Sequence, residues 1–201
     1  MIWDMPRVSE AHLAARRRQI IDAARACFSR NGFHATSMQD VISEAGLSVG
    51  AFYRYFRSKE ELISAIAEDV IGMIGEILDQ VRTDEPVPPL AEAMSRVLRA
   101  VEPQLGPDGV FPMALQVWAE SLRNPQLAEF VRRVYGTVRH HFDDLARRQI
   151  AAGHLPPGAD PHAVGTVLFS LIPGYALQRV LLGEPDVDTY IAGLHTLLTT
   201  R

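Results

Sequence analysis

Apolar residues recur every three to four positions along almost the whole of this 201-residue chain. This spacing lines one face of an α-helix, whereas a half-buried strand would alternate apolar and polar residues. No long alternating run interrupts the helical pattern. The sequence therefore predicts an all-α fold of about nine helices.

Glycine, proline and N-capping residues divide the pattern into segments. Gly32 ends the first helix, Ser58 with Glu61 forms a capping box that opens a long helix, and the Pro-rich stretch 85–89 is the first linker. We predict a domain at 9–75, containing a helix-turn-helix at 37–56, and a second domain at 76–201. The predicted helices are 13–31, 38–45, 48–55, 58–82, 90–101, 111–122, 127–152, 161–182 and 187–198.

Composition is that of an ordinary globular protein, with 47% apolar and 22% charged residues. Cys27 is the single cysteine, which excludes an intrachain disulfide and favours a reducing compartment. No export signal opens the chain, and the most hydrophobic stretch, 163–177, is too short to span a bilayer. We expect a cytoplasmic protein without a membrane partner.

The net charge of −4 is unevenly distributed. Residues 1–60 carry nine Lys or Arg against six Asp or Glu, a balance of +3, and the remainder carries eleven against eighteen, a balance of −7. A basic first third suggests that a polyanion would bind at the N-terminal end.

Residues 37–56 have the spacing of a helix-turn-helix. Ala45 is small enough for the two helices to approach closely, Gly46 supplies the turn, and Leu47 plugs the core beneath it. In the second helix, Phe52 and Phe56 alternate with small or hydrogen-bonding residues that would be exposed. A recognition helix needs this pattern to enter the major groove. A plain αα-hairpin with surface tyrosines is the alternative.

This segment resembles the DNA-binding domain of the tetracycline-repressor (TetR) family over about residues 12–72. The resemblance rests on three motifs: Gly32-Phe-His-Ala-Thr-Ser-Met-Gln-Asp-Val41, Ala45-Gly-Leu-Ser-Val-Gly-Ala-Phe-Tyr-Arg-Tyr-Phe56 and Ser58-Lys-Glu-Glu-Leu62. The rest of the chain is similar to the family in helix count and helix lengths.

The resemblance implies which residues contact DNA. The motif positions that contact DNA in the family, mostly at phosphates, are Thr36, Ser37, Ser48, Gly50, Tyr53, Tyr55 and Lys59, the last being the only lysine. Val49 and Arg54 fall on variable positions expected to face bases. Arg54 suits guanine, since its guanidinium fits O6 and N7. Val49 departs from the polar or basic residue that is common there and suits a thymine methyl group.

The family also implies a homodimer that pairs the last two helices with those of a partner. The apolar stretch 163–182 agrees with this expectation, and a central core helix is the alternative. As a hypothesis, Phe169, Tyr175 and Leu194 lie in or near the interface. The operator should then be an inverted repeat.

A regulator also needs an input, and we expect a small, largely hydrophobic effector inside the second domain. Ordinary core packing is the competing interpretation of each candidate. The candidate pocket residues are Phe111, Gln116, Trp118, Glu120, His141, Tyr175 and Gln178.

Other functions are poorly supported. Among His140, His141, Asp143 and Asp144, only His140 and Asp144 share a helix face, and two ligands do not make a metal site. No catalytic motif is present, so we expect no enzymatic activity and no cofactor. A pure protein-interaction module would leave the Tyr, Arg and Lys residues of 48–59 unexplained. We predict a DNA-binding regulator, a repressor released by its effector; an activator or a ligand-independent regulator is the alternative.

Overall fold

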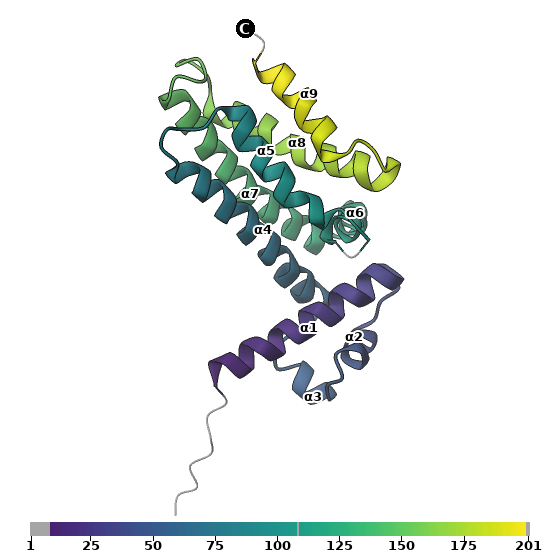
Figure 1. Ribbon diagram of the computed structural model, residues 1–201. Helices are drawn as coiled ribbons and strands as arrows, with labels where there is room; N and C mark the ends of the chain where they lie inside the picture. The colour runs from purple at the N-terminus through teal and green to yellow at the C-terminus, as the bar shows by residue number, and fades with distance from the viewer. Residues whose placement is uncertain (1–8, 108, 200–201) are drawn as a thin grey trace, which may run out of the picture. The chain divides into compact units, whose positions relative to one another are not determined.

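The computed structural model describes residues 9–107 and 109–199, and this part of the chain contains helices and no strand (Figure 1). The predicted all-α fold is therefore confirmed. The elements are α1 (Glu10–Asn31), α2 (Met38–Glu44), α3 (Val49–Phe52), α4 (Lys59–Thr83), α5 (Leu90–Val101), the 3₁₀ turn η1 (Glu102–Gln104), α6 (Val110–Ser121), α7 (Pro125–Ala151), α8 (Pro161–Leu182) and α9 (Val187–Thr199).

The ends of the helices follow the local signals in the sequence. Ser9, Asn124 and Asp160 each accept a hydrogen bond from the first turn of α1, α7 and α8, respectively. Gly32 and Gly183 follow α1 and α8 with positive φ angles of 82° and 75°, which only glycine adopts without strain. Most of these boundaries lie within one or two residues of the predicted ones.

At the start of α4, one of the two hydrogen bonds of the predicted capping box is present and the other has a different donor. The amide of Glu61 donates to the Ser58 hydroxyl at 3.3 Å, as expected. The Glu61 carboxylate, however, accepts from the amide of Arg57 at 2.7 Å instead of from that of Ser58.

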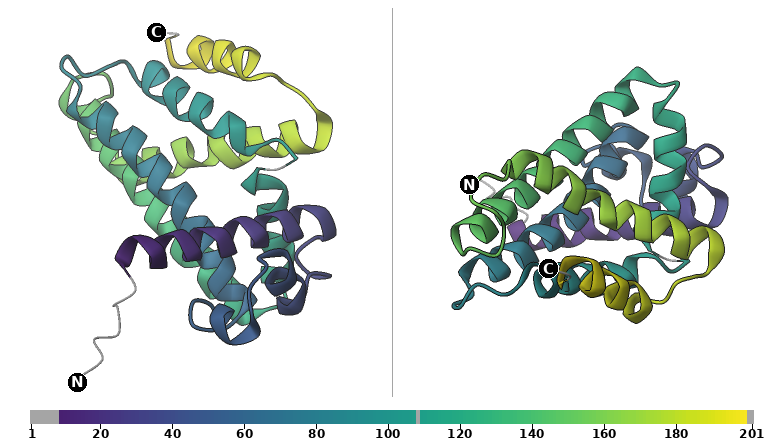
Figure 2. Two further views of the ribbon diagram at one scale, coloured as in Figure 1. Left: turned by 60° about the horizontal axis from the view of Figure 1, so that its bottom comes forward. Right: turned by 90° about the horizontal axis from the view of Figure 1, so that it is seen from above.

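The chain divides into two compact units, with the boundary between Ile66 and Ala67 inside α4. The predicted boundary at 75/76 also falls inside α4, which is continuous and supplies residues to both units. In the first unit, α1 packs on α2, and α2 and α3 lie on the same side of α1 in Figure 1 and in the left view of Figure 2. Its core side chains include Ile20, Phe28, Val41, Phe52 and Leu62, all fully buried.

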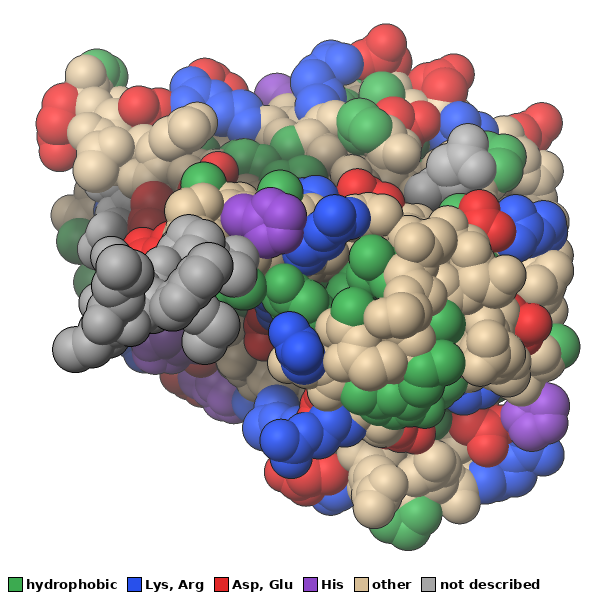
Figure 3. Space-filling view, turned by 90° about the horizontal axis from the view of Figure 1, so that it is seen from below, with side chains coloured by type: hydrophobic (Ala, Val, Ile, Leu, Met, Phe, Trp, Pro, Cys, Tyr) green, Lys and Arg blue, Asp and Glu red, His purple; other side chains and the backbone are tan. Residues whose placement is uncertain are grey.

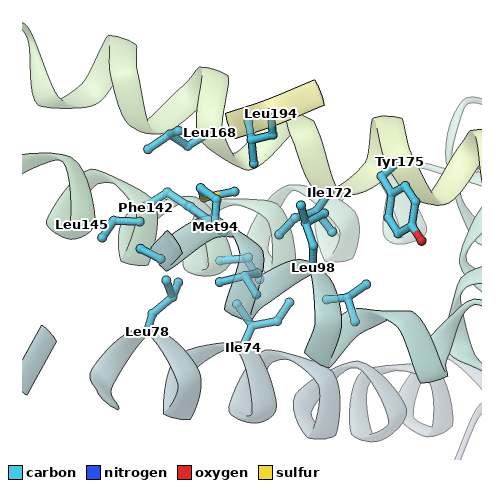
Figure 4. Close-up of a cluster of buried hydrophobic side chains, with 14 of the residues drawn as sticks. Ile74, Leu78, Met94, Leu98, Phe142, Leu145, Leu168, Ile172, Tyr175 and Leu194 are labelled. Atoms are coloured by element: carbon cyan, nitrogen blue, oxygen red, sulfur yellow. The ribbon is translucent and has the colours of Figure 1, made fainter. Parts of the chain in front are cut away.

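The second unit has its own hydrophobic core, to which every helix from α4 to α9 contributes (Figure 4). Met94, Leu98 and Phe142 are completely buried at its centre. The long helices α7 and α8 pack directly on one another. Helix α9 packs on α5. This core is built from side chains at helical spacing on each element, as the sequence pattern predicts.

Close contact between α7 and α8 depends on Gly165. A Cβ atom at this position would lie 2.2 Å from Oδ1 of Asp143 and 2.7 Å from the Asp143 backbone nitrogen. Asp143 is itself buried, and its other carboxylate oxygen lies 3.1 Å from Nδ1 of His162. Gly165 therefore sets how near the two helices come.

Helix α8 is apolar on two faces. Leu168, Ile172 and Ala176 are buried on one side, whereas Val167, Leu177 and Leu181 are 61%, 40% and 65% exposed on the other. As a whole, α8 is long and apolar enough to cross a membrane by length and composition, which corrects the expectation drawn from 163–177 alone. Core helices of soluble proteins share this length and composition, and 28% of the most apolar part of α8 is buried inside the structure.

Candidate nucleic-acid interface

The turn between α2 and α3 is built around Gly46 and Ala45 as the sequence predicts, whereas Leu47, predicted to fill the core beneath it, is only half-buried. Gly46 has a φ of 63°, in the left-handed region that favours glycine. Ala45 is buried, and the amide of Leu47 donates to the carbonyl of Ile42 at 3.3 Å, which closes the turn. The two short helices are thereby held in a helix-turn-helix.

Helix α3 separates buried from exposed side chains. Phe52 and Phe56 point inward, with exposed fractions of 0% and 3%. Val49 and Tyr53 are 50% and 43% exposed, large values for apolar and aromatic residues. The other exposed predicted DNA contacts of this segment are Ser48, Gly50 and Arg54, and Tyr55 is half-buried.

This recognition segment is less helical than predicted. We expected a helix over 48–55, but α3 ends at Phe52. The chain then continues in a tight turn, in which the amides of Tyr55 and Phe56 both donate to the Phe52 carbonyl, at 2.9 and 3.3 Å. Anchoring of Phe52 and Phe56 in the core fixes this turn and the exposed side chains between them.

Thr36 does not offer its side chain to DNA, contrary to the prediction. It is 1% exposed, and its hydroxyl donates to the carbonyls of Gly32 and Cys27, at 2.8 and 3.1 Å. The residue therefore ties the end of α1 to the start of α2. A residue's place in a family motif does not show whether its side chain faces the DNA or the protein core.

Ser37 is exposed and forms the predicted capping box with Asp40. Its amide and its hydroxyl both donate to Oδ2 of Asp40 at 2.7 Å, and the Asp40 amide donates back to the hydroxyl at 3.2 Å. The hydrogen bonds from the amide and then from the hydroxyl hold the pKa of the Asp40 carboxyl below its ordinary value. Ser37 therefore starts α2, whatever contact it makes with DNA.

Lys59 anchors the loop between α1 and α2. Its Nζ donates to the carbonyls of Thr36, Phe33 and His34, at 2.8, 2.9 and 3.4 Å. The ammonium also lies 4.6 Å from the centre of the Phe33 ring, within cation–π range. The predicted phosphate contact of Lys59 would have to compete with these bonds inside the protein.

Of the seven predicted effector residues, only His141 lines the cavity that is formed by described residues. The ring of Phe111 packs edge to face against the half-buried Trp118, and Trp118 packs in the same way against Tyr135. Burial raises the pKa of Tyr135 to about 12. Their packing resembles a core more than a binding site. Gln116 is exposed, the partly exposed Glu120 pairs with Arg123, and Gln178 is exposed and donates to the Gly174 carbonyl.

Tyr175 is fully buried and has a structural role. Its hydroxyl donates to the carboxylate of Glu102, which also accepts from Arg179 at 3.2 Å. Desolvation and then this hydrogen bond raise the pKa of Tyr175 well above its ordinary value. The group joins α8 to the end of α5, so Tyr175 was wrongly predicted as a pocket residue.

His141 does line a cavity, of about 130 Å³, between α4 and α7. Its imidazole packs on Gly75 of α4, where a Cβ would lie 3.4 Å from two ring atoms. Two leucines and several polar groups share the lining, which is less hydrophobic than the pocket we expected. The remaining lining residues are Leu78, Asp79, His140, Asp144, Leu145 and Arg148.

Of the three predicted interface residues, Tyr175 and Leu194 lie in the core of the second unit and Phe169 packs against it. Leu194 is 5% exposed and Tyr175 is fully buried, while Phe169 packs against Tyr135 and Phe142. Periodicity alone cannot orient a helix that is apolar on both sides, so the sequence could not tell the buried face of α8 from its exposed face, and the interface through α8 and α9 stays a prediction. The exposed apolar residues of α8 and α9 are Val167, Leu177, Leu181, Leu182, Leu197 and Leu198.

The histidine and aspartate residues of α7 offer no metal site in the described residues, where no three metal-binding side chains converge. Nε2 of His140 lies 3.7 Å from Asp144, the one pair that the sequence placed on a common face.

Two family models match the chain. Residues 20–66 match the model of the bacterial regulatory proteins of the tetR family. Residues 86–201, more than half of the chain, match the C-terminal model of the BetI-type transcriptional repressors.

Individual proteins agree with these models. An HTH-type transcriptional regulator of Bacillus subtilis, YfiR, is 29% identical over 193 residues, which cover 94% of this chain and 91% of its own. The solved structure of Salmonella enterica GusR superposes with a TM-score of 0.75 at 25% identity, over 96% of this chain and 99% of that one. A regulator from Saccharomonospora viridis, solved in complex with choline, shares the fold at 24% identity with a TM-score of 0.70, covering 92% and 96% of the two chains.

Proposed function

Because the chain belongs to the tetR family of bacterial regulatory proteins, it is a DNA-binding transcriptional regulator, and we propose that it acts as a homodimeric repressor released by a small molecule. The cytoplasm is its place of action in this proposal. Repression is favoured because the C-terminal half matches the BetI-type repressors.

The exposed side of α3 carries the proposal for DNA recognition. Val49, Tyr53 and Arg54 project from a segment whose other side is anchored by the buried Phe52 and Phe56. Arg54 would read a guanine through its fork-shaped guanidinium, and Val49 would touch a thymine methyl group. Ser37, Ser48, Gly50, Tyr53 and Tyr55 would approach the sugar–phosphate backbone, which positions the protein without reading sequence.

The second apolar face of α8 supports a dimer. Val167, Leu177 and Leu181 lie on the side of α8 opposite its core residues, and Leu197 of α9 is 79% exposed. Exposed apolar side chains gathered on one face in this way normally mark an interface. A two-fold dimer through α8 and α9 would bury it and would present two recognition segments to an inverted repeat.

The effector would bind in the second unit and act through α4. Leu78 and Asp79 of α4 line the cavity beside His141, and the same helix begins at Lys59 in the first unit. A cavity of about 130 Å³ is comparable to one that holds a benzene-sized molecule. A ligand that prefers one position of α4 would shift the balance between DNA-binding and released states.

Selection from a pool of random duplexes tests the proposal. Purified protein should enrich an inverted repeat whose half-site centres lie about one helical turn apart, since two symmetric recognition segments must meet successive major grooves. Enrichment of a single unrepeated site would contradict the dimeric arrangement, and the absence of enrichment would contradict specific DNA recognition.

A further inference from the structure

Helix α1 extends well beyond the core that it helps to form. Its first buried side chain is Ile20, ten residues after the helix begins at Glu10. Within this extension Arg16 is half-buried, and the other side chains are exposed. The family model begins at residue 20, so the extension lies outside the matched region.

Two arginines of the extension continue the buried face of α1. Arg16 and Arg17 precede the buried Ile20 and Ile21 by four residues each, and four residues return to the same helix face. Both side chains are therefore directed toward the helix-turn-helix that packs on that face.

Arg16 is held at one end of the recognition segment. Its Nη1 donates to Oε1 of Gln19 at 2.7 Å. The Nε2 of Gln19 in turn donates to the carbonyl of Ala45, the residue that ends α2, also at 2.7 Å. Gln19 thus fixes the guanidinium of Arg16 relative to the turn that precedes α3.

Arg17 is held at the other end. Its guanidinium carbon lies 5.4 Å from the centre of the Phe56 ring, in cation–π range. Phe56 is 3% exposed and closes the turn that follows α3. Arg17 therefore contacts the residue that follows the recognition segment, and Arg16 is linked through Gln19 to the turn that precedes it.

We propose that Arg16 and Arg17 form a second DNA contact, to the sugar–phosphate backbone on either side of the major groove that α3 enters. This inference rests on the proposed function. The partner chemistry is that of a polyanion, because residues 10–19 carry three arginines and one glutamate. Figure 3, a view from below, shows Lys and Arg side chains on this side of the molecule, interspersed with Asp and Glu. Gln19 would be a positioning residue that does not touch DNA.

Salt dependence distinguishes this contact from a structural role. Each phosphate contact contributes about 0.9 to the slope of log affinity against log salt concentration. Binding of a fluorescein-labelled duplex of random sequence is followed by anisotropy between about 50 and 200 mM salt. Arg16→Ala and Arg17→Ala should each lower the slope by about one unit per bound protomer and weaken binding roughly five- to tenfold.

Three further variants sharpen the test. Arg16→Lys should restore the slope, since it keeps the charge, whereas Gln19→Leu should lower the slope although the charge is unchanged. Arg123→Ala is the matched control, because Arg123 has a side chain that is 78% exposed and lies outside the first unit. Thermal melting should be similar for all variants.

The outcomes separate this inference from the proposed function. If the wild-type protein binds the duplex and the Arg16→Ala, Arg17→Ala double variant keeps its slope, the second contact does not exist. An affinity loss that Arg16→Lys does not restore, together with a lower melting temperature, would assign Arg16 a structural role and also overturn the inference. Failure of the wild-type protein to bind any duplex at low salt would instead contradict the proposed function.

Discussion

The ammonium of Lys59 lies 2.8 Å from the carbonyl oxygen of Thr36, and this bond joins the first residue of α4 to the residue before the cap of α2. The ammonium also donates hydrogen bonds to the carbonyls of Phe33 and His34. The only lysine of the chain thus holds the loop that precedes the helix-turn-helix.

Replacing Lys59 tests this role. Lys59→Met keeps the length of the side chain but removes the donors, and we expect the loop at 33–36 to lose about 1–2 kcal/mol of local stability. Amide hydrogen exchange in this loop should accelerate, and DNA affinity should fall on specific and random duplexes alike. Lys59→Arg, which keeps the charge and donors, should lie closer to the wild type. Unchanged exchange together with a flatter salt slope would instead identify Lys59 as a phosphate contact.

Arg54→Ala should relax sequence choice. Loss of a bidentate contact to guanine removes about 1–3 kcal/mol of discrimination at one base pair of each half-site. Repeating the duplex selection with this variant should give the same inverted repeat, with one position in each half-site no longer specified. A uniform loss of affinity for all sequences would show that Arg54 binds phosphate.

Leu181→Glu should dissociate the dimer. Leu181 is 65% exposed on the second apolar face of α8, so in a dimer the new carboxylate would be buried without a partner. Sedimentation should show monomers that retain their helical circular dichroism. Leu122→Glu is the matched control, since Leu122 is 87% exposed outside α8 and α9 and should stay dimeric. If the Leu181→Glu variant stays dimeric, the dimer interface must lie on another surface of the protein.

Gly165→Ala should destabilise the second unit. The added Cβ would lie 2.2 Å from the Asp143 carboxylate and under 3 Å from the α7 backbone, so the helices must separate. Overpacking of this kind typically costs about 1–3 kcal/mol. Gly174→Ala in the same helix meets nothing within 4 Å and should be neutral or slightly stabilising. Equal melting temperatures for the two variants would contradict the close approach of α7 and α8.

The sequence predicted the elements more reliably than the directions of their side chains. Gly46 and Ser37 mark a turn and a cap by local chemistry, and both are as predicted. Leu194 and Tyr175 lie on helices with apolar residues on several sides, so periodicity could not say which side faces the core. The placement of Tyr175 depends on Glu102, which lies 73 residues away in the sequence and carries no local signal.

In the candidate DNA-binding site, too, the sequence predicted the elements better than the directions of the side chains. The exposed face of α3 follows from the spacing of Phe52 and Phe56, whereas the buried position of Thr36 follows from carbonyls supplied by Gly32 and Cys27. The bond between Gln19 and Ala45 spans 26 residues and links two elements whose contact no local pattern reveals. Contacts of this kind require the tertiary structure.

In the proposed mechanism, effector binding in the second unit is coupled to DNA binding in the first, and a titration measures this coupling. A small molecule that raises the melting temperature of the protein is titrated into free protein and into protein saturated with its selected operator. We expect weaker effector binding to the operator complex, and operator binding weakened by the same factor when effector is saturating, because linkage is reciprocal. Equal effector affinity in both titrations would contradict the account of a sensor coupled to DNA binding.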